Sequence, residues 1–186
     1  MLFKRLSLVV LVAAASQAAL AAPATSAIQF EGAVKGTTCT VSVGGVDASS
    51  PSTVTLSDFA LDVFTPGEGA WAEMWGNEFA IDLKGCSGPA TQVRASFQGG
   101  NGTTVTDGLL NNMATDSPAS NIQLRLKAGR YPQLRDIDVG GDQSTLPYAS
   151  INGGAARLNY SVHYLAVGAF TAGNIEAAVE YTVAYQ

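Results

Sequence analysis

The 186-residue sequence predicts an all-β fold, an antiparallel sandwich of short strands. Three observations predict it. Apolar residues recur at every second position in several segments, glycine-rich turn signals separate these segments, and no segment sustains the 3.6-residue period of an amphipathic helix. With 47% apolar and only 13% charged residues, the chain is also too hydrophobic for a disordered protein.

The first 21 residues have the pattern of a signal peptide. Lys4 and Arg5 precede an apolar run over residues 8–15, and the small residues of Ala19-Leu20-Ala21 follow, so we predict cleavage after Ala21. The apolar run is too short to cross a bilayer, and no later stretch approaches about 20 uninterrupted apolar residues. The mature chain is therefore expected to be exported and soluble, with no transmembrane segment.

Composition removes several classes of function. Without Lys4 and Arg5, the mature chain keeps eight basic and 15 acidic residues, a net charge of −7. An acidic chain does not neutralise phosphates, so no nucleic-acid partner is expected. Two cysteines cannot supply four thiolates to a zinc site or an iron–sulfur cluster, and we expect neither a metal site nor a cofactor.

Export decides how the two cysteines are interpreted. In an oxidising compartment an even number of cysteines usually pairs, so Cys39 and Cys86 are predicted to form a disulfide. A redox pair or two metal ligands are the alternatives, and both are disfavoured because the chain has no CxxC spacing and a single histidine.

The strongest alternation is at the C-terminal end. From Ile175 to Tyr185 one parity is apolar or aromatic and the other is largely polar or small, which predicts a long strand with one buried face. The same pattern predicts a strand over residues 158–166, and shorter strands over 79–83, 93–97 and 122–126. Turn signals lie at Gly44-Gly45, Pro66-Gly67 and residues 99–102, 140–142 and 152–154.

The buried parity changes near Gly36. Apolar residues are even-numbered from Ile28 to Val34 and odd-numbered from Cys39 to Val43. A β-bulge or a jump between the two sheets at Gly36 would produce this change.

A short alternating arm directly follows the cleavage site. Residues 24–30 contain Ile28 and Phe30, and no turn signal folds them back onto the next strand. A terminal arm without a partner frays, yet this one has apolar side chains to bury. Two interpretations stay open on the residues alone, an internal first strand or a strand given to another molecule.

Three stretches resemble a known family. They are Phe30-Glu31-Gly32-Ala33-Val34 shortly before Cys39, the run Ile81-Asp82-Leu83-Lys84-Gly85-Cys86, and the end Val179-Glu180-Tyr181-Thr182-Val183-Ala184-Tyr185-Gln186. With the penultimate Tyr185 and with Gly173 at the fourteenth position from the C-terminus, the chain resembles subunits of chaperone–usher fimbriae, the type 1 pilin-like family of Gram-negative bacteria.

The resemblance implies an incomplete immunoglobulin-like sandwich that lacks its last strand and carries an N-terminal donor-strand extension. It assigns residues 22–33 to the donor arm and 34–186 to the pilin domain, with a groove between the first and final strands. The implied donor residues are Ala24, Ser26, Ile28, Phe30 and Gly32. The implied residues of the groove and of chaperone recognition are Gly173, Val179, Tyr181, Val183, Tyr185 and Gln186.

The implied function is that of a structural subunit of an adhesive fimbria. A periplasmic chaperone would fill the groove first, and at an outer-membrane usher the arm of the next subunit would replace the chaperone strand. The implied partners are neighbouring pilin subunits, the chaperone and the usher. The implied location is the cell surface, reached through the periplasm.

Two other classes of function have less support in the sequence. An enzyme is not expected, because the chain has no GxSxG motif and its single His163 has the outward parity of its predicted strand. A monomeric exported carbohydrate-binding module is the alternative, since Trp71 and Trp75 lie near Glu73 and Glu78 and could form a platform for a sugar ring.

Overall fold

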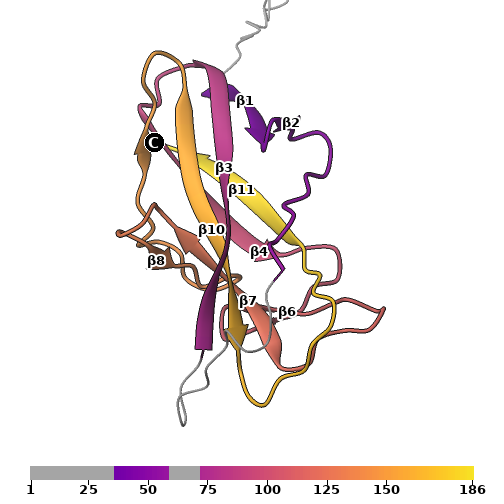
Figure 1. Cartoon of the computed structure of the whole chain (residues 1–186). Coiled ribbons are helices and arrows are strands. Elements are labelled where there is room, and N and C mark those ends of the chain that lie inside the picture. Colours follow the sequence, from indigo (N-terminus) through magenta and orange to yellow (C-terminus); the bar gives the residue numbers. More distant parts are fainter. Residues whose placement is uncertain (1–35, 59–71) are drawn as a thin grey trace, which may run out of the picture. The chain divides into compact units, whose positions relative to one another are not determined.

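The computed structural model describes residues 36–58 and 72–186, all within the unit Lys35–Gln186, and every regular element among them is a strand (Figure 1). The predicted signal peptide, the predicted donor arm with the first half of the parity change, and Trp71 lie outside the described residues. Gly36, at which the parity change is predicted, is the first of the described residues.

Eight of the described strands form one antiparallel sheet. Its long central strands are β3 (Ala72–Ser87) and β10 (Ala156–Ala166), and each has a further neighbour, β1 (Thr38–Val43) beside β3 and β7 (Ile122–Ala128) beside β10. Short strands complete the sheet: β2 (Val46–Asp47) pairs with β1, β6 (Leu109–Asn111) and β8 (Arg135–Asp136) pair with β7, and β5 (Val105–Thr106) pairs with β6.

The other three described strands form a second antiparallel sheet. Its centre is β4 (Gln92–Gly99), flanked by β11 (Val179–Tyr185) and by the short β9 (Ala149–Ser150). Figure 1 shows β4 and β11 crossing behind β3 and β10. The core lies between these layers, where the ring of Phe97 on β4 packs edge-on against Tyr160 on β10 with centroids 4.9 Å apart. The predicted all-β antiparallel sandwich is confirmed.

The two-residue period corresponds to the layers as predicted. On β7, Ile122, Leu124 and Leu126 are at most 5% exposed, and the residues between them are partly exposed. The Gly44-Gly45 signal joins β1 to β2, with φ angles of +58° and +85° that suit the two central residues of a type I′ turn.

The predicted disulfide is present. A bond joins the sulfur atoms of Cys39 on β1 and Cys86 on β3, and the register of the two strands shifts there, between the pairs Thr38–Ser87 and Thr40–Lys84. Cys39, Val41 and Val43 pack on the core, which confirms the odd parity predicted for this strand.

The prediction that His163 faces outward is wrong. Its side chain is 6% exposed, and its Nε2 lies 3.0 Å from Ser161 Oγ. The alternation itself holds, since His163 is on the face opposite the core, but β10 is a central strand. Side chains from β3 and β7 cover that face.

Charged side chains form this cover. Glu73 Oε1 accepts from His163 Nδ1 at 2.8 Å and from Lys127 Nζ at 2.7 Å, and Arg125 Nη1 lies 3.2 Å from Glu73 Oε2. Asp136 on β8 closes the network with ion pairs to Arg125 and Lys127 at 3.2 and 3.0 Å. The long stems of Arg125 and Lys127 thus exclude water from His163 while their charged ends stay near the surface.

The burial of His163 predicts a pH dependence. Burial lowers its pKa, the charges of Lys127 and Arg125 act in the same direction, and Glu73 and Asp136 oppose them. The unfolded chain takes up a proton below about pH 6.5 before the folded chain does, so stability is complete above that pH and falls until the folded pKa is passed. We expect His163→Gln to lose less stability than the wild type between about pH 7.5 and about pH 5.5, measured by urea unfolding. Equal losses would contradict this account.

The disulfide predicts a second measurable effect. The two cysteines are 47 residues apart, and loop entropy values a bridge of that span at about 4 kcal/mol. We expect the variant with both Cys39→Ser and Cys86→Ser to lower the free energy of unfolding by about that amount in urea titrations. The reduced wild type is the control, and a change below about 1 kcal/mol in both would show that the bridge is not a main constraint.

Candidate functional site

The last strand has one paired edge and one open edge among the described residues. Gln92 and Gln186 exchange both backbone hydrogen bonds at 2.9 Å. From this pair onward, hydrogen-bonded and non-hydrogen-bonded residue pairs alternate along β11 and β4. In an antiparallel ladder the intervening residues direct their N–H and C=O groups away from the partner. These residues are Val179, Tyr181, Val183 and Tyr185, and no described strand meets their outward backbone groups.

The side chains of the same four residues are half-buried. They pack against the core cluster but are not fully covered by it, whereas the alternate residues of β11 are exposed. Tyr181 approaches Phe97 of β4 with ring centroids 6.5 Å apart. Burial raises the pKa of Tyr181 and of Tyr185, and for Tyr181 the charge of Asp47 on β2 adds to the effect. β11 therefore presents unpaired backbone groups and incompletely covered apolar side chains along one line.

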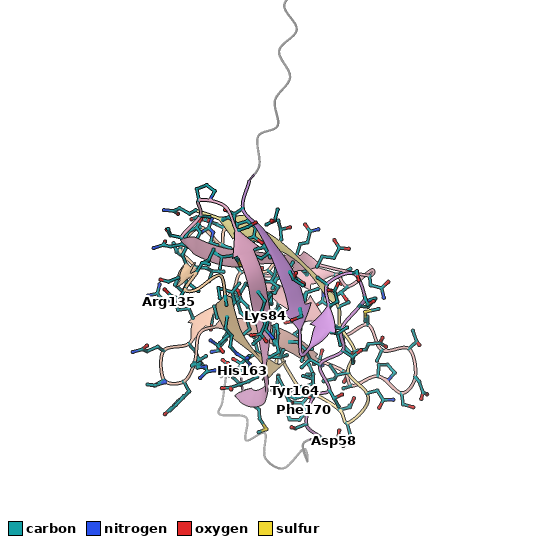
Figure 2. All side chains as sticks on the ribbon, turned by 90° about the horizontal axis from the view of Figure 1, so that it is seen from above. Asp58, Lys84, Arg135, His163, Tyr164 and Phe170 are labelled. Atoms are coloured by element: carbon teal, nitrogen blue, oxygen red, sulfur yellow. A yellow bond between two sulfur atoms is a disulfide. The ribbon has the colours of Figure 1, made fainter. Side chains whose placement is uncertain are left out.

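A groove lies where the segment leading into β11 passes the segment that follows β2. It has a volume of about 770 Å³. Leu56, Ala119, Ile122 and Ile175 supply apolar walls, while Asp58, Asp116 and Glu176 supply acidic groups. Figure 2 shows Asp58 and Tyr164 at this end of the domain.

Hydrogen bonds to the larger sheet hold the Leu56 wall. The Ser57 N–H donates to Asn77 Oδ1 of β3 at 2.6 Å, and the Tyr164 hydroxyl of β10 donates to the Ser57 carbonyl at 3.0 Å. Burial raises the pKa of Tyr164, and the nearby Asp58 adds to this, so its hydroxyl remains a donor at neutral pH.

A single asparagine builds the opposite wall. Asn112 Nδ2 donates to the carbonyls of Ala119 and Asn174 at 3.0 and 2.8 Å, and its Oδ1 accepts from the N–H groups of Ala114 and Glu176 at 3.0 Å each. The strand predicted from Ile175 therefore begins later, at Val179. The residues before Val179 at the start of the predicted strand bond to the loop at 112–119 instead of to β4.

A family model described as fimbrial protein matches residues 28–186. The major fimbrial subunit SMF-1 of Stenotrophomonas maltophilia (strain K279a) is 34% identical over 179 residues, which cover 94% of this chain and 99% of that protein. The chain belongs to the fimbrial protein family.

Two further similarities agree with this membership. The F17 fimbrial protein of Escherichia coli is 34% identical over 112 residues, 58% of this chain and 62% of that protein. The crystal structure of the P pilus rod subunit PapA has a TM-score of 0.54 at 14% identity and covers 80% of this chain and 99% of that one. The second comparison supports the fold alone, an immunoglobulin-like pilin sandwich.

The chain is thus a structural fimbrial subunit, and the family is a structural one, not an enzymatic one. Across residues 36–58 and 72–186, no group of three His, Cys, Asp or Glu side chains is placed to hold a metal ion. None of the described elements is a helix long and apolar enough to cross a membrane. The side chain of Trp75, like Trp71, is outside the described residues, so the sugar platform stays a prediction.

The subunit brings most of the predicted groove residues into one line. Gly173 lines the groove, and Val179, Tyr181, Val183 and Tyr185 follow it along β11. Gln186 differs, because both of its backbone groups bond to Gln92 of β4. The predicted part of all six residues in chaperone recognition remains a prediction, and the predicted donor residues 24–32 lie outside the described residues.

The sequence did not reveal the other groove residues. Leu56 had a weak signal, since Val54 and Leu56 alternate with Thr53, Thr55 and Ser57. Tyr164 lies in the alternation predicted over residues 158–166, but its bond to a residue 107 positions away had no signal. Asn112 had none either, because it bonds to a residue 62 positions away.

Gly173 is confined by the backbone of the opposite loop. A Cβ at this position would lie 2.4 Å from the Ala119 nitrogen and 2.5 Å from the Pro118 carbonyl carbon, distances that no side chain tolerates. The neighbouring Asn174 exchanges backbone bonds with Ser117 and Ala119 at 2.8 and 2.9 Å, so the two segments cannot separate without cost.

We therefore expect Gly173→Ala to lower the free energy of unfolding by about 1 to 3 kcal/mol. Gly168→Ala is the matched control, because its nearest neighbour would be 3.8 Å away, an ordinary contact. Urea unfolding of both variants measures the difference. A Gly173→Ala variant as stable as the control would show that the loop at 117–119 yields freely.

Proposed function

We propose that this fimbrial subunit polymerises head to tail by strand addition at the open edge of β11. The incoming strand is the N-terminal arm, residues 22–33, of a second copy of this chain. The observation that carries the proposal is the set of four residues on β11 whose backbone groups and half-buried side chains both lack a complete partner among the described residues. An added antiparallel or parallel strand satisfies both deficits at once.

The arm has the composition that such an edge requires. Its alternate residues are Ala24, Ser26, Ile28, Phe30 and Gly32. Burying the side chains of Ile28 and Phe30 contributes about 1.5 to 3 kcal/mol each, and each new backbone hydrogen bond adds about 0.5 to 1.5 kcal/mol. The apolar groove at Leu56 and Ile175 provides the space into which these side chains extend.

The same geometry accounts for a filament. Each subunit gives an arm at one site and receives one at another, so the contact is heterologous and does not close into a ring by symmetry. A free subunit with an open edge is prone to aggregate. We infer that a periplasmic chaperone covers the β11 edge until an outer-membrane usher exchanges it for the next arm, and that the fimbria is displayed on the cell surface.

A grafted arm tests the proposal. A copy of residues 24–33 joined after Gln186 through a short linker can fill the chain's own groove, and burial of two large side chains predicts a gain of about 3 kcal/mol or more in the free energy of unfolding. The control graft carries Phe30→Asp in the copied segment only. We expect the first graft to be a stable monomer in the absence of chaperone and the control graft to gain little.

Filament assembly supplies the complementary measurement. Phe30→Asp in the native arm should abolish fibre growth seen by electron microscopy while the subunit still accepts an arm from a wild-type copy. Normal fibres from that variant, or a graft that brings no gain in stability, would overturn the proposal.

A further inference from the structure

β4 has a second edge, on the side away from β11, and different groups lie against that edge along its length. Because the even-numbered residues of β4 bond to β11, the backbone groups of Val93, Ala95 and Phe97 point toward the opposite edge. An edge strand with such groups free would template strand addition as readily as β11 does. The partners of these three residues therefore decide where another chain can attach.

Strand β9 covers only one end of this edge. Val93 pairs with Ala149, and the Ile151 N–H donates to the Thr91 carbonyl at 2.7 Å. The Tyr160 hydroxyl, which extends from β10, lies near the backbone of Ala95, and burial raises its pKa to about 12. Beyond Ala95 no described strand continues along β4.

The side chain of Gln143 takes the place of that missing strand at Phe97. Gln143 Oε1 accepts from the Phe97 N–H at 2.8 Å, and its Nε2 donates to the Phe97 carbonyl at 2.7 Å. A primary amide offers one acceptor and two donors, so this pair of bonds reproduces what a residue of a paired strand provides. The second Nε2 donor bonds to the Asp138 carbonyl at 2.8 Å, and the residue is 9% exposed.

Arg94 of β4 and the aromatic ring of Tyr148 hold the loop that carries Gln143. Arg94 Nη1 donates to the carbonyls of Gln143 and Ser144 at 3.3 and 2.7 Å, and its guanidinium lies 4.8 Å from the centre of the Tyr148 ring. The Gly140 N–H donates to the Phe97 carbonyl at 2.9 Å. Gln143 is therefore held in position by contacts that do not involve the open edge of β11.

We propose that Gln143 determines the site of strand addition: it seals the β4 edge, so that a donor arm is accepted at β11 and not on the other side of the same sheet. This inference rests on the proposed function, because it assumes that arms of other copies are the strands to be directed. Its consequence is an unbranched filament with one arm received per subunit.

Gln143→Ala in the self-complemented chain, with residues 24–33 grafted after Gln186, tests this. The graft occupies the β11 edge, so any further binding reports a second edge. A synthetic peptide of residues 24–33 is titrated against each protein and the bound ratio measured. We expect no peptide on the parent and one per chain on Gln143→Ala, with concentration-dependent self-association in sedimentation. Gln98→Ala is the matched control, because that side-chain amide bonds to Glu180 of β11 and is exposed.

Amide hydrogen exchange measures directly whether the β4 edge opens in the variant. In Gln143→Ala the Phe97 amide should exchange at least about tenfold faster while the Ser96 amide, which faces β11, keeps its rate. An unchanged Phe97 rate, or a fast rate in a variant that stays monomeric and binds no peptide, overturns the inference. Arg94→Ala, which loosens the loop and keeps Gln143, provides a second variant with the same expected direction.

The two proposals fail separately. If the graft gives no stability and the peptide binds the parent as well as the variant, arm donation at β11 is wrong. If the graft stabilises the chain and Gln143→Ala behaves as the parent does, only the role of Gln143 is wrong.

Discussion

Pairing of backbone groups along the edges of the three-stranded sheet is the constraint on which the rest of the subunit depends. β4 bonds to β11 on one side, and on the other side Val93 pairs with β9 and both backbone groups of Phe97 bond to the Gln143 amide. Among the described strands, β11 is satisfied on one side only. An added strand would pair the outward backbone groups of β11 and cover its apolar side chains together, so the open side of β11 is the place where a further strand gains most.

The half-buried state of the β11 side chains follows from the same incompleteness. Tyr181 and Val183 pack on the core, yet no layer covers their outer side among the described residues. A fully buried strand would have no apolar area left to bury against another strand. A fully exposed strand would lack the core contacts that fix its position beside β4. The intermediate burial keeps β11 ordered while leaving apolar area that the proposed arm would bury.

The sequence predicted those parts that depend on local alternation. The strands around Leu124, Val93 and Tyr160 and the Gly44-Gly45 turn could be predicted from neighbouring residues, and the Cys39–Cys86 pair from the predicted export and the even number of cysteines. His163 could not, because its burial depends on Glu73 and Lys127 of other strands. Asn112 and Gln143 could not either, since each bonds to backbone groups distant along the chain. A side chain that bonds to a distant backbone in this way produces no alternating pattern in the sequence.

The disulfide has a mechanical place in such an assembly. In a filament joined as proposed through residues 22–33, tension enters the described part of the domain at Gly36 and reaches β1 first, a strand whose only long partner among the described strands is β3. Cys39 is the second residue of β1, and its bond to Cys86 passes the load to β3, which pairs with β10 over eleven residue pairs. The hydrogen bonds of β1 are thereby spared from separating one at a time, starting from the end where the arm is attached.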